Sequence, residues 1–369
     1  MTVKQAFRYE LDPTSRQANL LARAAGTARY AFNWGLNLAR GLLGKKLPVP
    51  SAPEFHRLWN VFKRENAPWW SEVSKCAPQE ALRDLRRAFE NFFSSREGKR
   101  KGPKVGFPRY RKKGRDDRFR LTGRIRVGRR AVKLPRIDWV RTKESTTKFR
   151  GRVLSATVRR EADRWYVSLQ VEVERPDPRS HAGSVVGVDL GLKVFAVLSD
   201  GTVVAPGKAL VRALTALRRR SKAHSRRKKG SKRRRKSALS LARLHRRVAN
   251  RRRDFHHKLS TTLTKTMSVV VIEDLAVKGM VRNHRLARAI SDAGWGHFRR
   301  MLEYKAEWYG CRIVVADRFY PSSKMCSGCG AVKAELALSE RTFTCEACGL
   351  VMDRDLNAAI NLEHLAQAV

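Results

Sequence analysis

Four cysteines near the end of the chain stand in two Cys-x-x-Cys pairs, and fifteen residues separate one pair from the other. Two residues between thiolates let both sulfurs turn inward from one tight turn, and four thiolates complete the tetrahedral coordination of Zn²⁺. Such a site has no open position for a substrate, so the pattern predicts one structural zinc ion in a zinc ribbon over residues 321–352. The expected ligands are Cys326, Cys329, Cys345 and Cys348.

Other uses of the cysteines are less favoured. Incidental burial of four cysteines at this doubled spacing is one alternative, and a redox role is weaker still, because nothing around the pairs indicates a thioredoxin-like unit. Cys76 and Cys311 have no partner at ligand spacing, and we expect them in the core. A disulfide framework belongs to small secreted chains, so this cysteine usage predicts a cytoplasmic protein.

The net charge limits what the chain can bind. With 80 Lys and Arg against 33 Asp and Glu, the formal net charge is +47 and the isoelectric point about 11.3, far more than solubility requires. An anionic membrane is the weaker partner, because no run approaches the roughly 18 uninterrupted apolar residues of a spanning helix. The opening MTVKQAFRYELDP also lacks the apolar core of a signal peptide. We expect a nucleic-acid partner and no membrane association.

Two stretches carry most of the excess charge. Residues 211–260 hold 21 Lys and Arg with one acid, and residues 96–143 hold 20 with four acids and interspersed aromatic residues. Cations can hold phosphates while exposed rings stack on bases. A solvated charged face is the alternative, and residues 225–237 are expected to stay solvated or disordered without a partner. The candidate contacts are Arg109, Tyr110, Arg111, Lys112, Arg226, Arg227, Arg233, Arg234, Arg235, Arg246 and Arg247.

The first half of the chain predicts a β-barrel interrupted by helices. Helical spacing begins at Ser15, the expected cap of the first helix, and Pro78 suits the first turn of another. A hairpin of alternating residues turns near Asp163, and the opening segment predicts a further strand. The expected bounds are residues 1–10 and 98–178 for a nucleic-acid-binding barrel, and residues 11–97 for a helical domain.

The second half, after Pro176 and Pro178, predicts a mixed sheet with helices. Three short apolar segments joined by tight turns predict a meander, two later apolar runs predict buried strands, and a long basic region with an apolar stripe predicts a packed helix. The strands are expected at residues 185–190, 194–198, 202–204, 268–274 and 312–317, the basic helical region at 208–265 and a last helix at 355–366. The domain is expected over residues 184–320 and 353–369, with the ribbon inserted.

Three acids stand where this sheet has strand ends or a helix start. They are Asp189 in VGVDLG, Glu273 in VVVIEDL and Asp355 in DRDLNAA. Carboxylates on neighbouring elements of one sheet can converge on Mg²⁺, and two such ions about 4 Å apart support phosphodiester hydrolysis. This combination predicts a nuclease with an RNase H-like fold. A capping role is the alternative for any one acid, and spacing leaves Asp274 and Asp353 open as ligands.

VGVDLG also matches the phosphate loop of actin-like ATPases, which have a related core. That fold needs a second glycine-rich phosphate loop and an adenosine pocket. No Gly-Gly pair follows Asp189 in the sequence, so the nuclease interpretation is preferred.

Taken together, the order of these parts resembles the TnpB family of insertion-sequence proteins, compact relatives of type V CRISPR effector nucleases. The resemblance covers nearly the whole chain: FRYELDPTSRQANLLARAAGTARYAFNWGL and GFPRYRKK in the first half, then GVDLG, VIEDL, the cysteine pairs and DRDLNAAINL. The family pattern places the last catalytic Asp two positions before the Asn, which selects Asp355 over Asp353.

The resemblance implies an RNA-guided DNA endonuclease. A guide RNA would bind the wedge-like barrel, the helical recognition domain and the basic region, while base pairing reads double-stranded target DNA beside a short protein-read motif. Asp189, Glu273 and Asp355 would be the catalytic and Mg²⁺-binding acids of a RuvC-like site, with two ions expected. The protein would act in the prokaryotic cytoplasm, in practice at the nucleoid. No oligomeric state is predicted.

Three alternatives remain, in order of preference. The first is an unguided transposase or recombinase with an RNase H-like core, which would cut without RNA. The second is a guided DNA-binding repressor, disfavoured because all three acids are present. The third is a sequence-independent nucleic-acid chaperone, which would tolerate loss of the acids.

Overall fold

The computed structural model describes residues 1–100, 102–178, 183–337 and 339–367. The chain divides into two compact units, Met1–Arg175 and Pro176–Val369, and each is described by itself. The division falls at the first proline of the expected linker. The finer domain bounds expected from the sequence remain predictions.

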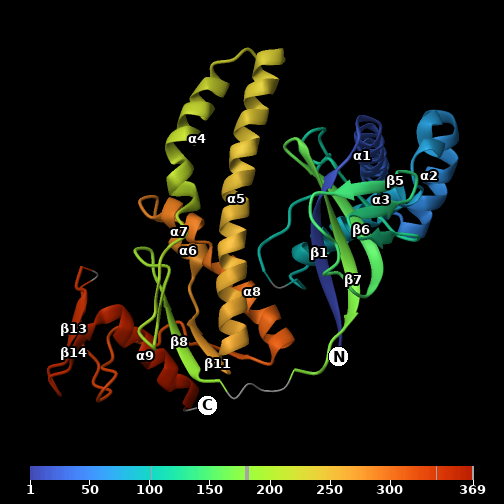
Figure 1. Ribbon diagram of the computed structural model, residues 1–369. Coiled ribbons are helices and arrows are strands. Elements are labelled where there is room, and N and C mark those ends of the chain that lie inside the picture. The colour runs from blue at the N-terminus through green and yellow to red at the C-terminus, as the bar shows by residue number, and fades with distance from the viewer. Residues whose placement is uncertain (101, 179–182, 338, 368–369) are drawn as a thin grey trace. The chain divides into compact units, whose positions relative to one another are not determined.

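A seven-stranded sheet runs through the first unit in the order β2-β6-β7-β1-β5-β4-β3 (Figure 1). Strand β1 pairs antiparallel with β7 along almost its whole length and with β5 at its end, which confirms the opening strand. The hairpin expected near Asp163 is β6 and β7. Closure of the sheet into a barrel remains a prediction. The strands are β1 (Thr2–Asp12), β2 (Arg118–Leu121), β3 (Arg126–Gly128), β4 (Ala131–Leu134), β5 (Asp138–Thr142), β6 (Arg152–Glu161) and β7 (Arg164–Glu174).

Helices separate β1 from β2 in the chain. Pro78 lies in the first turn of α3 as expected, but the cap of α1 is Thr14, not Ser15. The Thr14 hydroxyl accepts the Gln17 N–H, and the Gln17 side chain accepts the Thr14 N–H, so two donors at the helix start are satisfied. The elements are α1 (Ser15–Gly44), α2 (Ala52–Asn66), η1, a 3-10 helix (Pro68–Glu72), and α3 (Cys76–Arg96).

One apolar core joins these helices to the sheet. It extends from Tyr9 of β1 through all three α-helices to Val171 of β7. Helices α1 and α3 approach closely at Gly35, where a Cβ would lie 2.8 Å from the Leu82 side chain. The inserted helices and the sheet therefore stabilise each other through shared apolar burial.

A five-stranded mixed sheet organises the second unit, in the order β10-β9-β8-β11-β12. The first three strands form an antiparallel meander, while β11 runs parallel to both β8 and β12. The five expected strands are confirmed, each a little shorter than expected or equal in length. They are β8 (Val185–Leu190), β9 (Ala196–Leu198), β10 (Val203–Val204), β11 (Val269–Glu273) and β12 (Arg312–Ala316).

The last helix, α9 (Arg354–Gln367), packs directly on β8, the central strand of this sheet. The two elements are so close that a Cβ on Gly187 would overlap the carbonyl oxygen of Ala359. Glycine is required at position 187 because only its hydrogen fits under the helix. This packing brings the start of α9 to the same sheet that carries the other two predicted acids.

The basic region forms two helices side by side, α4 (Ala209–Ser225) and α5 (Lys232–Thr266) (Figure 1). Leu244 and Val248 of the expected apolar stripe are buried against α4. Residues 232–237, which were expected to stay solvated or disordered, are solvated but helical, because α5 begins at Lys232 with the Ser231 hydroxyl as its cap. The charged side chains there stay largely exposed.

The remaining elements complete the second unit. Helix α8 packs on α5, and β13 pairs with β14 in a separate two-stranded sheet within the expected ribbon. In the described part of the chain, no helix has the length and apolar character needed to cross a membrane. These elements are α6 (Val277–Met280), α7 (Ala287–Ala293), α8 (Trp295–Tyr309), β13 (Thr342–Thr344) and β14 (Val351–Asp353).

His256 of α5 predicts an acid sensitivity of this unit. The ring is buried, and its Nε2 donates to the Ala293 carbonyl of α7 at 2.8 Å. Burial, with Arg252 and His297 nearby, lowers its pKa to about 4. An unfolded chain takes up this proton near pH 6.5, so stability is lost as the pH falls from about 6.5 toward 4, by about 1–2 kcal/mol at pH 5.

The measurement is hydrogen exchange of the α5 and α7 amides at pH 7 and pH 5, corrected for intrinsic exchange rates. In His256→Gln, the protection of the α5 and α7 amides should decrease less between pH 7 and pH 5 than it does in the wild type. The remaining pH dependence comes from the neighbouring histidines, which are unchanged. Equal pH dependence in both proteins would contradict the assignment.

Candidate functional site

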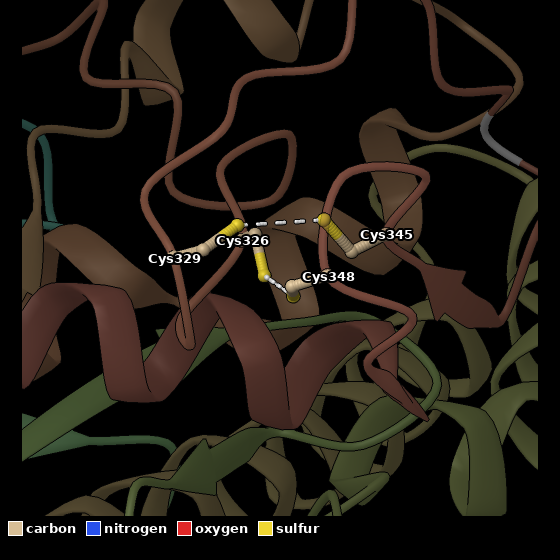
Figure 2. Close-up of side chains that lie close together, drawn as sticks. All are labelled: Cys326, Cys329, Cys345 and Cys348. Carbon is tan, nitrogen blue, oxygen red and sulfur yellow. Dashed lines mark hydrogen bonds between the residues drawn. The ribbon is translucent and has the colours of Figure 1, made fainter.

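The four predicted zinc ligands lie together. Their sulfur atoms are all within 4.8 Å of one another (Figure 2), and two sulfur pairs, Cys326 with Cys348 and Cys329 with Cys345, are 3.6 Å apart. Sulfurs bound tetrahedrally to one zinc ion at 2.3 Å would be roughly 3.8 Å apart. Among the residues that the structure describes, this is the one group of three or more His, Cys, Asp or Glu side chains placed to hold a metal ion as it stands.

The two cysteine turns have matching backbone geometry. The N–H of Gly330 donates to the Cys326 carbonyl, and the N–H of Gly349 donates to the Cys345 carbonyl. Both glycines are left-handed, with φ of 75° and 74°, a conformation that glycine adopts without strain. Backbone N–H groups of Cys348 and Ala347 lower the pKa of Cys345, whereas neighbouring sulfurs raise the pKa of Cys329 and Cys348, because negative charges this close repel one another until a cation is bound.

The three predicted acids come from three elements of one sheet and its covering helix. Parallel pairing matches Val188 of β8 with Ile272 of β11. The next residue on each strand is an acid, Asp189 on β8 and Glu273 on β11. Both acids therefore lie near the carboxyl ends of adjacent parallel strands, and their side chains project from the same face of the sheet. Asp355 lies in the first turn of α9, which packs on β8.

These carboxylates interact electrostatically. Burial, followed by the charges of Glu273 and Asp355, raises the pKa of Asp189 well above its usual value. Burial also raises the pKa of Glu273, with Asp355 adding to the shift, while a 2.8 Å hydrogen bond from the Ser322 hydroxyl opposes it. Three mutually repelling carboxylates at a buried edge are a donor set suited to a hard divalent cation.

The two rival acids have other partners. Asp353 accepts the N–H groups of Asp355 and Leu356 at 2.9 and 3.0 Å, so it caps the start of α9. Asp274 pairs with Arg299 at 2.7 Å and Arg318 at 2.6 Å. The capping bonds favour a structural role for Asp353, while Glu273 and Asp355 are the carboxylates whose charges act most strongly on Asp189, which makes them the better candidates.

Sequence reasoning did not anticipate the partners of the acids. Ser322 holds Glu273, and Arg354 and Arg341 lie 3.0 and 3.8 Å from Asp355. Arg354 directly precedes Asp355 in the chain, so this ion pair could have been predicted from the sequence. Ser322 and Arg341 are distant in sequence from the acids they contact, so no local pattern indicates them.

The predicted nucleic-acid contacts fall in two places. Residues 109–112 lie between α3 and β2, where Arg109 and Lys112 are exposed but Arg111 is engaged inside the unit. The Arg111 guanidinium pairs with Asp84 at 2.9 Å and lies 3.8 Å from the Phe32 ring centroid. The Tyr110 hydroxyl donates to the Asn37 side chain at 3.4 Å.

The second group lies on the α4–α5 pair. Arg234 is half-buried and donates to the carbonyl oxygens of His224 and Arg227, which closes the turn between the helices. Arg246 is also half-buried. The exposed members of this group are Arg226, Arg227, Arg233, Arg235 and Arg247.

Three family models match the chain. A model described as "Probable transposase" matches residues 168–284, one described as "Cas12f1-like, TNB domain" matches residues 295–362, and one described as "Helix-turn-helix domain" matches residues 1–42. In the structure, the last of these segments contains β1 and most of α1.

Curated relatives cover almost the whole chain. A Mycobacterium tuberculosis (strain H37Rv) protein named "Putative RNA-guided DNA endonuclease" is 42% identical over 97% of this chain and 85% of its own length. InsQ of Escherichia coli (strain K12), with the same description, is 33% identical over 99% of this chain and 93% of its own. The solved structure of a Cas12f1-sgRNA-target DNA complex has 14% identity, a TM-score of 0.53, and coverage of 98% of this chain and 99% of that one, which shows a shared fold. By its sequence, the chain belongs to the TnpB family of insertion-sequence proteins.

Proposed function

We propose that this protein is an RNA-guided DNA endonuclease. The observation that carries the proposal is the match to relatives named as such, at 33–42% identity over 97–99% of the chain. The clustered acids at the sheet edge support it, because an enzyme that cuts phosphodiesters needs a site for divalent cations. Acting on DNA of the prokaryotic nucleoid, it would work in the cytoplasm.

The cutting site is assigned to a RuvC-like, RNase H-like domain over residues 184–320 and 353–369. A three-strand antiparallel meander extended by two parallel strands is the sheet of that fold, and the order β10-β9-β8-β11-β12 supports the assignment. The ribbon over residues 321–352 is inserted between β12 and α9 and would hold one zinc ion.

Asp189, Glu273 and Asp355 would hold two Mg²⁺ ions. When bound, these ions supply an activated water and stabilise the leaving oxygen of the phosphodiester. The protein's own side chains orient the ligands: the Ser322 hydroxyl fixes Glu273, and the Asp353 carboxylate fixes the first turn of α9 that carries Asp355. Arg354 and Arg341 balance the charge of Asp355.

Guide RNA and double-stranded target DNA are the proposed partners. The wedge-like barrel of residues 1–10 and 98–178, the recognition helices of residues 11–97 and the basic helices of residues 208–265 would bind them. The excess of exposed cations on α4 and α5 supports this, since phosphate contacts dominate nucleic-acid affinity.

A triple change of Arg233, Arg235 and Arg247 to Gln tests these contacts. A plot of log affinity against log salt has a negative slope, and each lost phosphate contact on duplex DNA makes that slope shallower by about 0.9. The triple change should therefore reduce the magnitude of the slope by about 2 to 3. The measurement is a salt titration of binding to a fixed duplex. Arg111→Gln is the matched control, because its loss breaks an internal pair and should lower stability with the slope unchanged.

The decisive test of function uses protein purified from cells that carry the native flanking DNA. RNA that stays bound through a high-salt wash is sequenced, and the complex is incubated with Mg²⁺ and matching or mismatched DNA. A defined RNA whose variable end dictates the DNA cut supports the proposal.

An unguided transposase is the second candidate, favoured by the "Probable transposase" description of the model over residues 168–284. In the same experiment it would cut fixed element ends with Mg²⁺ and no discrete RNA. A guided repressor would retain the RNA and bind DNA without cutting.

A further inference from the structure

Phe319 is exposed in a way that folding does not explain. Its side chain is 88% exposed, the highest value among the large apolar residues that the structure describes. It lies in a tight turn directly after β12. The Tyr320 N–H donates to the Asp317 carbonyl at 3.1 Å, and the Phe319 N–H donates to the Asp317 carboxylate at 2.8 Å. The backbone beneath the ring is therefore held in place.

The same turn is tied to the elements that carry the acids. Arg318 pairs with Asp274, the neighbour of Glu273, at 2.6 Å. Three residues beyond Phe319, the Ser322 hydroxyl bonds Glu273 itself. These contacts fix one side of the turn to the end of β11.

The other side of the turn is fixed to the last helix. The Tyr320 hydroxyl donates to the carbonyl oxygen of Asn361 in α9 at 2.9 Å. Since α9 also carries Asp355, the backbone that carries the Phe319 ring keeps its place relative to Glu273 and Asp355. A single exposed apolar residue is ordinary on a protein surface. Here, however, the turn is fixed by hydrogen bonds and an ion pair, so the exposed ring can bind a partner with little ordering of the backbone.

The chemistry of that partner follows from the surroundings. Two arginines near the acids remain accessible beside their acidic partners: the side chain of Arg318, on the turn itself, is 54% exposed, and that of Arg341, near Asp355, is 44% exposed. Phosphate groups are attracted to such cations, and a flat exposed ring offers a stacking surface to any of the four bases. A strand of nucleic acid satisfies both features at once.

We propose that Phe319 stacks on a nucleobase of the DNA strand next to the phosphodiester that is cut, and so positions that bond over the acids. The inference rests on the proposed nuclease function. Because every base has a π-face, this contact would position the strand without reading its sequence. Phe319 is thus a positioning residue and not part of the chemistry.

Single-turnover cleavage by the purified complex tests the proposal. Phe319→Ala should slow cutting roughly ten-fold, in the range of one lost base stack, with target binding unchanged, and Phe319→Trp should restore the rate. Val351→Ala is the matched control, because Val351 is also exposed (62%) and lies in the ribbon strand β14. It should cut at the wild-type rate.

Abasic DNA gives the sharper readout. In the wild type, removing one base near the cut should slow cleavage about as much as Phe319→Ala does. In Phe319→Ala the same abasic site should have little further effect, because both changes remove one contact. If the abasic site and Phe319→Ala slowed cleavage independently, so that their two effects multiplied at every abasic position tested, the proposal would be overturned.

A readout without cutting separates this inference from the nuclease function. With Asp189→Ala as background, 2-aminopurine near the cut position should be quenched by stacking, and Phe319→Ala should restore its fluorescence. Unchanged fluorescence overturns the proposal even when the wild type cuts. A change in the mass of the complex on Phe319→Ala, seen by light scattering, would also overturn it, since the ring would then contact a protein. A wild-type protein that never cuts any guided target would instead contradict the proposed function.

Discussion

Asp189→Ala is expected to abolish target cleavage while guided binding to the same DNA stays unchanged, and Glu273→Ala and Asp355→Ala should behave alike. Metal ions contribute several kcal/mol to phosphodiester hydrolysis, and losing about 4 kcal/mol slows a reaction about a thousand-fold. Asp189 and Glu273 lie on adjacent strands and Asp355 on α9, and the three charges interact with one another. We therefore expect each acid to supply its own ligand position, which the other two cannot fill. The measurement is single-turnover cleavage with saturating Mg²⁺, beside a binding assay on the same duplex.

Asp353→Ala is the control within the same segment. Its carboxylate caps α9, and loss of a cap costs about 1 kcal/mol of stability. Cleavage should therefore persist at a reduced but measurable rate. If Asp353→Ala stopped cleavage and Asp355→Ala did not, the ligand role would pass to Asp353.

Removal of zinc is the second large effect. Cys345→Ser, or a strong chelator, is expected to release one zinc ion per chain and unfold the ribbon. Zinc in small four-ligand sites contributes about 10–16 kcal/mol of apparent folding free energy. The ribbon's own apolar core is only a small cluster around Phe343, Cys326 and Cys345, so it cannot compensate. Zinc is measured by elemental mass spectrometry, and unfolding by hydrogen exchange over residues 321–352.

Cys76→Ser serves as the control for the zinc experiment. Cys76 lies in the first unit, where its thiol contacts the Thr122 carbonyl at 3.4 Å. One zinc ion per chain should remain bound in this variant. Full zinc content in Cys345→Ser would show that the cysteine cluster does not hold the metal.

The strands of the second unit are predictable because their sequences are unambiguous. β11 is a continuous apolar run between a long helix and an acid, and β8 is bounded by glycine. The position of the first helix cap was predicted wrongly, because two adjacent residues compete for that role. Thr14 and Ser15 are both suitable caps, and the reciprocal bond of Gln17 decides between them.

Charge patterns are less reliable, because they do not reveal tertiary partners. Residues 232–237 repel one another locally, yet Ser231 caps the helix there and Arg234 bonds the carbonyls at the end of α4. Arg111 looks like a phosphate contact in sequence, but Asp84 and Phe32 engage it. The positions of the three candidate acids are easier to predict, since each stands near an element end that the sequence itself marks, while their catalytic role stays a prediction.

The packing of α9 on β8 also sets the order of events during protein synthesis. Asp189 is the first of the three acids to be made, and the helix that carries Asp355 is made more than 160 residues later. If the three carboxylates act together as proposed, a nascent chain that has not yet reached Asp355 would lack the complete set. The order of synthesis would therefore delay assembly of the three-acid site until α9 has been made and has packed on β8.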